Sequence, residues 1–242
     1  MARFTILLYG VAAYLIFLLT FLYAIGFMGN FLVPKSIDSG ADGPFVNALI
    51  VNVILLSIFA VQHSVMARPA FKTWWTKIIP KAAERSTYTL LSSLALILLF
   101  YYWQPMGGII WQVEAGSIAQ IILYSLFGFG WALVLFSTFL INHFDLFGLR
   151  QVYLNFIGKE YAALKFGTPG IYKLIRHPLY LGWFFAFWAT PTMTAAHLAF
   201  AIITTTYILL AIRWEEQDLL TALGEDYANY RKLVPMIIPF TK

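Results

Sequence analysis

The string Gly170–Gly182 carries side chains that are suited to bind a charged ligand. Its Arg176 can bind a carboxylate through a charge-assisted hydrogen bond, or it can reach the phosphates of lipid headgroups. His177 precedes Pro178, a proline that restrains the preceding backbone to extended conformations and that can begin a helix. The ring and the backbone groups of His177 are then available to a ligand, although a histidine at a helix end can also be purely structural.

A second string, Arg213–Leu219, contains two adjacent carboxylates, Glu215 and Glu216. Adjacent residues lie about 100° apart around a helix, so these two acids cannot face the same way. We expect Glu216 to pair with Arg213, three residues earlier, and Glu215 to bind a ligand hydroxyl or ammonium group. The two roles can also be exchanged, and the alternative to a site is a solvated acidic helix end.

His143 and Asp145 follow the end of an apolar stretch and form a third polar group. A carboxylate beside a histidine can hold its tautomer and raise its basicity, so this pair can accept a proton from a nucleophile. In the alternative, Asp145 pairs with Arg150 at a helix end. The catalytic candidates are therefore His143, Asp145 and Arg213, which act as a base or as a stabilising positive charge.

These polar groups lie in a chain that is otherwise apolar. Of its 242 residues, 61% are hydrophobic and only 11% are charged, whereas a soluble domain has about 25% charged residues. So few charges cannot cover a surface in water, so lipid must solvate much of this one. The composition excludes a soluble globular enzyme, a disordered chain and a repeat solenoid.

Three further classes of site are excluded or not expected. The chain has no cysteine, which excludes disulfides, thiolate zinc sites and cysteine nucleophiles. With only four histidines, we expect no metal site. The net charge of +5 is not arranged as a basic stripe with aromatic residues, so we expect no nucleic-acid partner.

Apolar stretches between the charges predict the membrane segments, over residues 5–28, 45–66, 86–103 and 117–141. A final stretch, 179–212, has 34 residues without Asp, Glu, Lys or Arg. As one helix it would be about 50 Å long, against a hydrocarbon core of about 30 Å.

The final stretch also contains Pro191, which breaks helices. We therefore predict a hairpin over 179–216, with helices over 179–189 and 194–216, which crosses the membrane twice or re-enters it.

The loop charges predict the orientation of these segments. Two loops are basic, and the positive-inside rule places them in the cytoplasm: they contain Arg68, Lys72, Lys77, Lys81 and Arg85, and Arg150, Lys159, Lys165, Lys173 and Arg176. Both termini are then cytoplasmic. Short loops without cysteine are typical of a multi-pass protein of a bacterial inner membrane.

The predicted fold class is all-α: a polytopic membrane helix bundle of about five to six membrane segments with a C-terminal helical hairpin. We expect one transmembrane domain over 1–242. Its region 142–242, which includes the hairpin, is expected to face the cytosol and to hold the cofactor and the catalytic groups.

The ordered strings resemble the motifs of the isoprenylcysteine carboxyl methyltransferase and phospholipid methyltransferase group of membrane enzymes. The R-H-P-x-Y-x-G motif of that group matches Arg176–Gly182, and its E-E-x-x-L motif matches Glu215–Leu219. Tyr227, Tyr230 and a Val-Pro pair follow, as in the group. The segment 142–151 is similar to the methanethiol S-methyltransferase branch, and the NnrU-type membrane proteins share part of it.

This resemblance implies S-adenosylmethionine as the cofactor. It implies transfer of a methyl group by direct displacement to a small thiol, most simply methanethiol, giving dimethyl sulfide. Alternative acceptors are a lipid amine or a prenylcysteine carboxylate, and a further alternative is a non-enzymatic NnrU-like membrane protein. The expected partners are the small thiol and membrane lipid. The cofactor-binding residues that the resemblance implies are Tyr172, Arg176, His177, Pro178, Tyr180, Gly182, Glu215, Glu216 and Tyr227.

Large aromatic side chains crowd the start of the predicted hairpin. This crowding favours a small substrate, although bulky residues can equally line a lipid tunnel. Trp183 and Trp214 can contact a sulfonium through cation–π interactions, or they can belong to the aromatic belt at the membrane interface.

Overall fold

A computed structural model of the protein describes residues 2–241. Its fold is an all-α membrane helix bundle with one small sheet, and four helices, α1, α2, α5 and α9, are long and apolar enough to cross a membrane. The protein is therefore an integral membrane protein. The helices are α1 (Ala2–Gly29), α2 (Phe45–Ala67), α3 (Pro69–Trp75), η1 (Lys81–Ala83), α4 (Glu84–Tyr102), α5 (Ile118–Ile141), α6 (His143–Leu146), α7 (Leu149–Phe156), η2 (Gly170–Lys173), α8 (Pro178–Trp188), α9 (Ala195–Leu223) and α10 (Glu225–Leu233). The strands are β1 (Ile109–Gln112) and β2 (Thr192–Thr194).

The predicted apolar segments match the long helices to within three residues at most ends. The hairpin prediction is also confirmed at helix level, because α8 and α9 lie on either side of Pro191. One prediction needs correction: the second helix of the hairpin was expected to end at residue 216, but α9 continues to Leu223. In addition, α4 is not among the four helices that meet the criteria for a span, and its buried residues include five Ser and Thr side chains.

The chain divides into two compact units, each assembled from separate stretches of sequence. The first unit contains the chain up to Gly107 together with Asn142–Ala163. Within it, α4 packs against both α1 and α2, and α7 packs against α1. Gly10 makes the last contact possible, since a Cβ there would lie 2.5 Å from a methyl group of Val152. The predicted region 142–242 thus has parts in both units.

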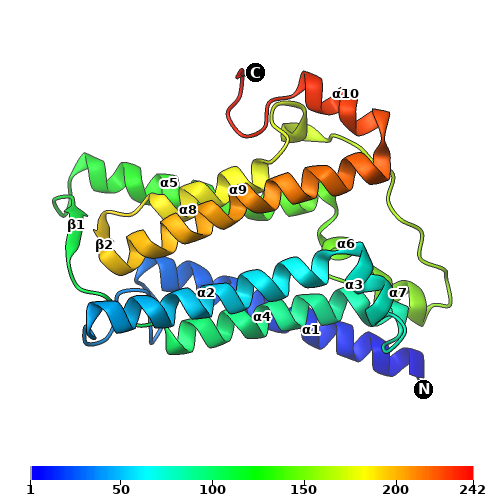
Figure 1. Cartoon of the computed structure of the whole chain (residues 1–242), viewed down its shortest axis with the longest axis horizontal. Helices are drawn as coiled ribbons and strands as arrows, with labels where there is room; N and C mark the ends of the chain where they lie inside the picture. Colours follow the sequence, from blue (N-terminus) through cyan, green and yellow to red (C-terminus); the bar gives the residue numbers. More distant parts are fainter. Residues whose placement is uncertain (1, 242) are drawn as a thin grey trace. The chain divides into compact units, whose positions relative to one another are not determined.

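The second unit contains Gly108–Ile141 and the chain from Leu164 onward. In it α8 and α9 form the hairpin and α5 lies along α8 (Figure 1). The connection from α8 to α9 forms β2, which pairs antiparallel with β1 just before α5.

Two glycines allow α5 and α8 to pack backbone to backbone. A Cβ on Gly130 would lie 2.6 Å from the backbone N of Ala186 and 2.7 Å from the carbonyl O of Gly182. A Cβ on Gly182 would in turn lie 2.8 Å from the carbonyl O of Gly130. Because neither backbone atom can move aside without moving its helix, this contact fixes the position of α8 against α5.

We expect Gly130→Ala to destabilise the protein by about 1–3 kcal/mol, the usual range for overpacking a close contact. Alanine is the better helix former, so a loss of stability would have to come from the clash. Unfolding in detergent, followed by circular dichroism, measures the change. Gly128→Ala on the same helix is the control, because a Cβ there meets no atom within 4 Å. Equal stability of the two variants would refute the close contact.

Candidate functional site

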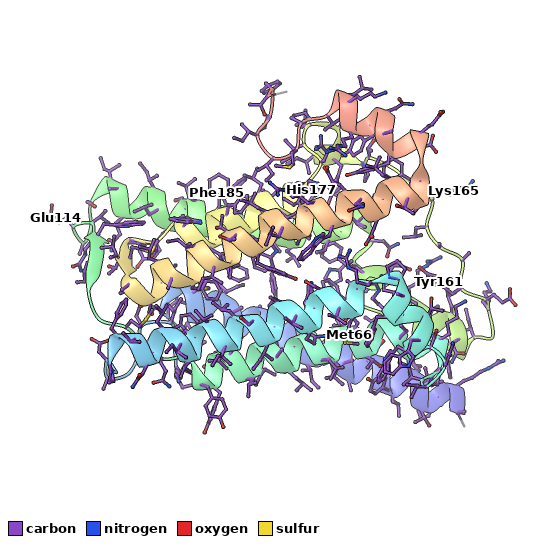
Figure 2. The ribbon with its side chains drawn as sticks, in the orientation of Figure 1. Met66, Glu114, Tyr161, Lys165, His177 and Phe185 are labelled. Atoms are coloured by element: carbon purple, nitrogen blue, oxygen red, sulfur yellow. The ribbon has the colours of Figure 1, made fainter. Side chains whose placement is uncertain are left out.

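The Arg-His-Pro string lies between η2 and the first turn of α8. Pro178 is the first helical residue of α8, and the helix begins with a hydrogen bond from the backbone N–H of Leu181 to the carbonyl of His177, 3.1 Å. The His177 side chain is only 5% exposed. Figure 2 labels His177 where the ribbon enters α8. The proline therefore begins the helix as predicted and leaves His177 just outside it.

The carboxylate of Glu216 contacts three nitrogen-bearing side chains from two segments of the second unit. Its Oε1 accepts hydrogen bonds from Nε of Arg176, 2.8 Å, and from Nε2 of His177, 3.1 Å. Nε of Arg231 lies 3.4 Å from Oε2. The side chains of Arg176 and Glu216 are each 9% exposed. A buried carboxylate of this kind is tolerated because its charge is paired and hydrogen-bonded.

Arg176 also holds the last turn of α10 and the segment that follows it. Its Nη1 donates to the carbonyls of Arg231, 3.1 Å, and Val234. The backbone N–H groups of Arg176 and His177 donate to the carbonyls of Pro235, 2.9 Å, and Met236, 3.0 Å. The Val-Pro pair noted in the sequence is thus an anchor for the start of α8.

Glu215 has a different environment from Glu216. Its side chain is 47% exposed, and its Oε2 accepts a hydrogen bond from the hydroxyl of Tyr180, 2.8 Å. Nδ1 of His177 lies 4.0 Å from the same oxygen. Oε1 of Glu215 makes no hydrogen bond within residues 2–241, so this carboxylate keeps an accessible acceptor.

Three tyrosines surround this cluster and stay protonated at physiological pH. Burial raises the pKa of Tyr172 and Tyr227 well above the ordinary value, and raises that of Tyr230 to about 12. The hydroxyl of Tyr230 donates to the carbonyl of Tyr172, 2.6 Å. The Tyr227 side chain is 2% exposed and its ring packs on Phe166. The protonated hydroxyls of these three residues are therefore not bases at this pH, and that of Tyr230 is a hydrogen-bond donor.

His143 and Asp145 belong to the first unit. His143 is buried, its Nε2 is 2.8 Å from the hydroxyl of Tyr14, and burial lowers its pKa. The carboxylate of Asp145 accepts from Arg150, 2.8 Å, and from the hydroxyl of Tyr161, 3.2 Å. The structure therefore forms the Asp145–Arg150 pair, the alternative that the sequence left open, and Asp145 does not orient His143.

The expected pairing of Glu216 with Arg213 is wrong. Arg176 and Arg231 approach the carboxylate from outside the helix and occupy both of its oxygens, while Arg213 is exposed on α9. Gly182, predicted to bind the cofactor, lies against the backbone of α5. Arg231 is the residue that the sequence analysis missed; its only signal was its place between the tyrosine pair and the Val-Pro pair.

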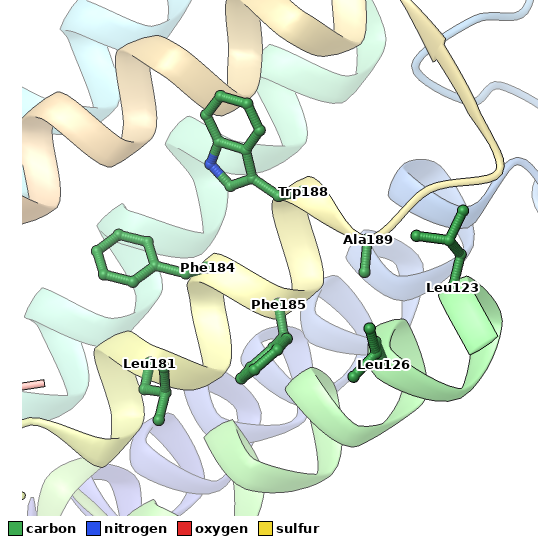
Figure 3. A pocket seen from close by; sticks show the side chains of 7 residues that line it. All are labelled: Leu123, Leu126, Leu181, Phe184, Phe185, Trp188 and Ala189. Carbon is green, nitrogen blue, oxygen red and sulfur yellow. The ribbon is translucent and has the colours of Figure 1, made fainter. Parts of the chain in front are cut away.

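The aromatic residues at the start of the hairpin divide into two groups. Trp183 packs inside the unit, edge to face with Trp131 at 5.2 Å and stacked on Phe187 at 5.2 Å. Others line an apolar groove of about 330 Å³ between α5 and α8 (Figure 3), whose walls are Leu123, Leu126, Leu181, Phe184, Phe185, Trp188 and Ala189. Within residues 2–241 no group of three or more His, Asp or Glu side chains could hold a metal ion.

Comparisons with known proteins identify relatives that match nearly the whole chain. No family model and no solved structure matches the chain. Methanethiol S-methyltransferase of Crocosphaera subtropica is 60% identical over 240 residues, which cover 99% of this chain and 94% of that protein. The Mycobacterium tuberculosis protein of the same name is 53% identical over 99% of this chain and 98% of its own length. Rat Nurim is 31% identical over 74% of this chain and 70% of its own length.

Membrane-spanning apolar helices and these relatives together define an integral membrane methyltransferase. The chain belongs to the methanethiol S-methyltransferase family. The resemblance first seen in the C-terminal part thus extends over nearly the whole chain, and the alternative of a non-enzymatic membrane protein is excluded.

We expect Glu216→Gln to destabilise the protein by about 3 kcal/mol or more, because the change leaves the buried guanidinium of Arg176 without its counter-charge. Glu215→Gln is the matched control: its side chain is half-exposed, and its loss should cost less than about 1 kcal/mol. Chemical unfolding in detergent measures both. Equal losses of stability in the two variants would contradict the role of Glu216 as the counter-charge of the buried Arg176.

Proposed function

We propose that this enzyme transfers the methyl group of S-adenosylmethionine to methanethiol and releases dimethyl sulfide. The observation that carries the proposal is the near full-length similarity to proteins named methanethiol S-methyltransferase. The cluster around Glu216 supports it, because its residues are those of the motif shared with membrane methyltransferases. The basic loops support a site that opens to the cytosol.

The groups of the second unit fit the chemical parts of the cofactor. S-Adenosylmethionine has a carboxylate, an ammonium group, ribose hydroxyls and a sulfonium. Nη2 of Arg176 makes no hydrogen bond within residues 2–241, so it can donate to the carboxylate. The accessible oxygen of Glu215 can accept from the ammonium or from a hydroxyl. The ring of Tyr180 can contact a cation.

Some residues of the cluster are placed to bind the ligand, and others hold those residues in position. Glu216 holds Arg176 and His177 in place, and the carbonyls of Val234, Pro235 and Met236 hold the same two residues from the other side. Arg176 is therefore fixed before a ligand arrives, which lowers the entropic cost of binding. Tyr180 orients Glu215 in the same way.

When bound, S-adenosylmethionine would supply a methyl group on a positively charged sulfur. The thiolate sulfur would bond to the methyl carbon as the methyl–sulfonium bond breaks, so that dimethyl sulfide forms and S-adenosylhomocysteine leaves. An enzyme can accelerate a displacement of this kind largely by holding the two reactants in line. The thiol must lose its proton to attack as a thiolate, which requires a base. We propose His143 as this base: burial lowers its pKa, so the ring is neutral and able to accept a proton at pH 7.

Calorimetry and headspace analysis test the function together. S-Adenosylmethionine should bind the purified protein in detergent, and dimethyl sulfide should form only when methanethiol is also present. No binding would refute any use of this cofactor. Binding followed by methylation of a lipid amine or a prenylcysteine carboxylate, without dimethyl sulfide, would refute methanethiol as the acceptor. Glu215→Ala should weaken cofactor binding about tenfold or more, as expected for a hydrogen bond to a charged group.

Glu225→Ala is the control for Glu215→Ala, since Glu225 is an exposed acid on α10 outside the cluster. It should bind the cofactor like the unaltered protein. If both variants bind normally, Glu215 does not contact the cofactor.

The pH dependence of turnover tests His143. The folded pKa of His143 lies below its ordinary value, so the neutral base persists as the pH falls towards 6.5 and turnover should stay level from pH 8 to that value. In His143→Gln the rate should follow the thiolate fraction and rise about tenfold per pH unit. Tyr14→Phe, which removes the hydroxyl partner of Nε2, should keep the level profile. A level profile in His143→Gln would show that another group accepts the proton.

A further inference from the structure

The segment Arg68–Lys81 of the first unit combines cationic and aromatic side chains at a membrane end of two helices. It contains four cations, Arg68, Lys72, Lys77 and Lys81, and no Asp or Glu. It directly follows α2, an apolar helix long enough to cross a membrane, and it leads into α4 through η1. Figure 2 labels Met66, in the last turn of α2. The segment therefore begins where α2 leaves the hydrocarbon.

The chain turns as soon as α2 ends and forms a short helix on the surface. Arg68 is extended, with φ −70° and ψ 140°, and the following proline begins α3. No residue of α3 is buried. Trp74 and Ile78 are 52% and 59% exposed. Exposed apolar side chains next to polar residues are typical of a surface that contacts a membrane or a partner.

The aromatic residues of α3 form one packed group. The ring of Phe71 lies 5.4 Å from that of Trp74 and 5.8 Å from that of Trp75, and the two Trp rings are 5.6 Å apart. Trp side chains concentrate at the membrane interface, where an apolar ring meets polar headgroups. The aromatic group thus indicates the depth at which the segment lies.

Two lysines of the segment, Lys77 and Lys81, are available for a ligand in water. Lys77 and Lys81 are exposed and make no ion pair within residues 2–241. Their charge is not balanced by acids in the segment, so the surface has a net positive potential next to the apolar helix ends. A protein partner would need a complementary acidic surface; the bilayer that must surround α2 already offers phosphate groups at this position.

We propose that Arg68–Lys81 is a docking surface for anionic phospholipids, with Lys77 and Lys81 on the headgroup phosphates and the exposed Trp74 and Ile78 against the acyl chains. Surface cations beside a membrane are attracted to anionic lipid headgroups. Aromatic anchoring and charge attraction then act together, as in interfacial amphipathic helices. The surface would bind lipid without cofactor or thiol, so it does not depend on the proposed function.

The test measures lipid binding to the full-length protein in neutral detergent by native mass spectrometry, with phosphatidylglycerol and phosphatidylcholine as probes. The protein should prefer phosphatidylglycerol, and the preference should fall as salt is added. Lys77→Gln/Lys81→Gln should weaken phosphatidylglycerol binding roughly ten- to thirtyfold, because two surface charges are removed. Phosphatidylcholine binding should not change.

Lys159→Gln/Lys165→Gln is the matched control, because it removes two exposed lysines from a segment that also contains an acid, Glu160. It should lose less than about threefold in phosphatidylglycerol binding. Equal losses for the two double variants would overturn the proposal, and so would full competition by inorganic phosphate, which would indicate a site for the free anion. Thermal unfolding of each variant without lipid checks that both remain folded, as expected for exposed side chains.

Discussion

The second unit depends on one buried carboxylate, that of Glu216. In a chain with 11% charged residues, a charge away from water must be matched by partners inside the protein. Here the partners come from the start of α8 and from α10, so a single group joins segments that are far apart in the sequence. The paired Arg176 then holds the segment after α10 through its Nη1. Removing this carboxylate would release several elements at once.

The neighbouring carboxylate, Glu215, is available to bind a ligand because it is Glu216 that pairs with the buried Arg176. The two side chains point in different directions around α9, so one is buried among cations and the other stays half-exposed beside Tyr180. This division requires a regular helix at both positions. Since α9 continues to Leu223, Glu215 and Glu216 lie within the helix and not at a frayed end.

Local patterns in the sequence predicted the elements of the fold but not the partners of the charges. Apolar runs and Pro191 were enough to place α1, α2, α5 and the two helices of the hairpin, because these depend on residues close in sequence. The sheet was missed because β2 has three residues and its partner β1 lies about 80 positions earlier. The local i−3 rule misassigned Glu216 for the same reason, since its partners are 40 residues before it and 15 after it.

The same sheet explains how an apolar stretch can turn at Pro191. With 11 residues, α8 rises about 16 Å, about half of a hydrocarbon core. Backbone groups beyond its end need partners inside the protein, because lipid offers none. The carbonyl of Pro191 accepts from Val113, that of Thr190 accepts from the indole of Trp111, and that of Gly108 accepts from Ala195. The connection therefore pairs its polar groups with the chain just before α5.

The close contact of Gly130 with Gly182 holds α8 against the middle of α5. Because of this contact, α8 and then β2 run alongside α5 towards its first residue. An interruption at Pro191 would leave backbone groups unpaired if the hairpin stood alone. Paired with β1, it allows α8, which is half the usual length, to pack along the full-length helix α5.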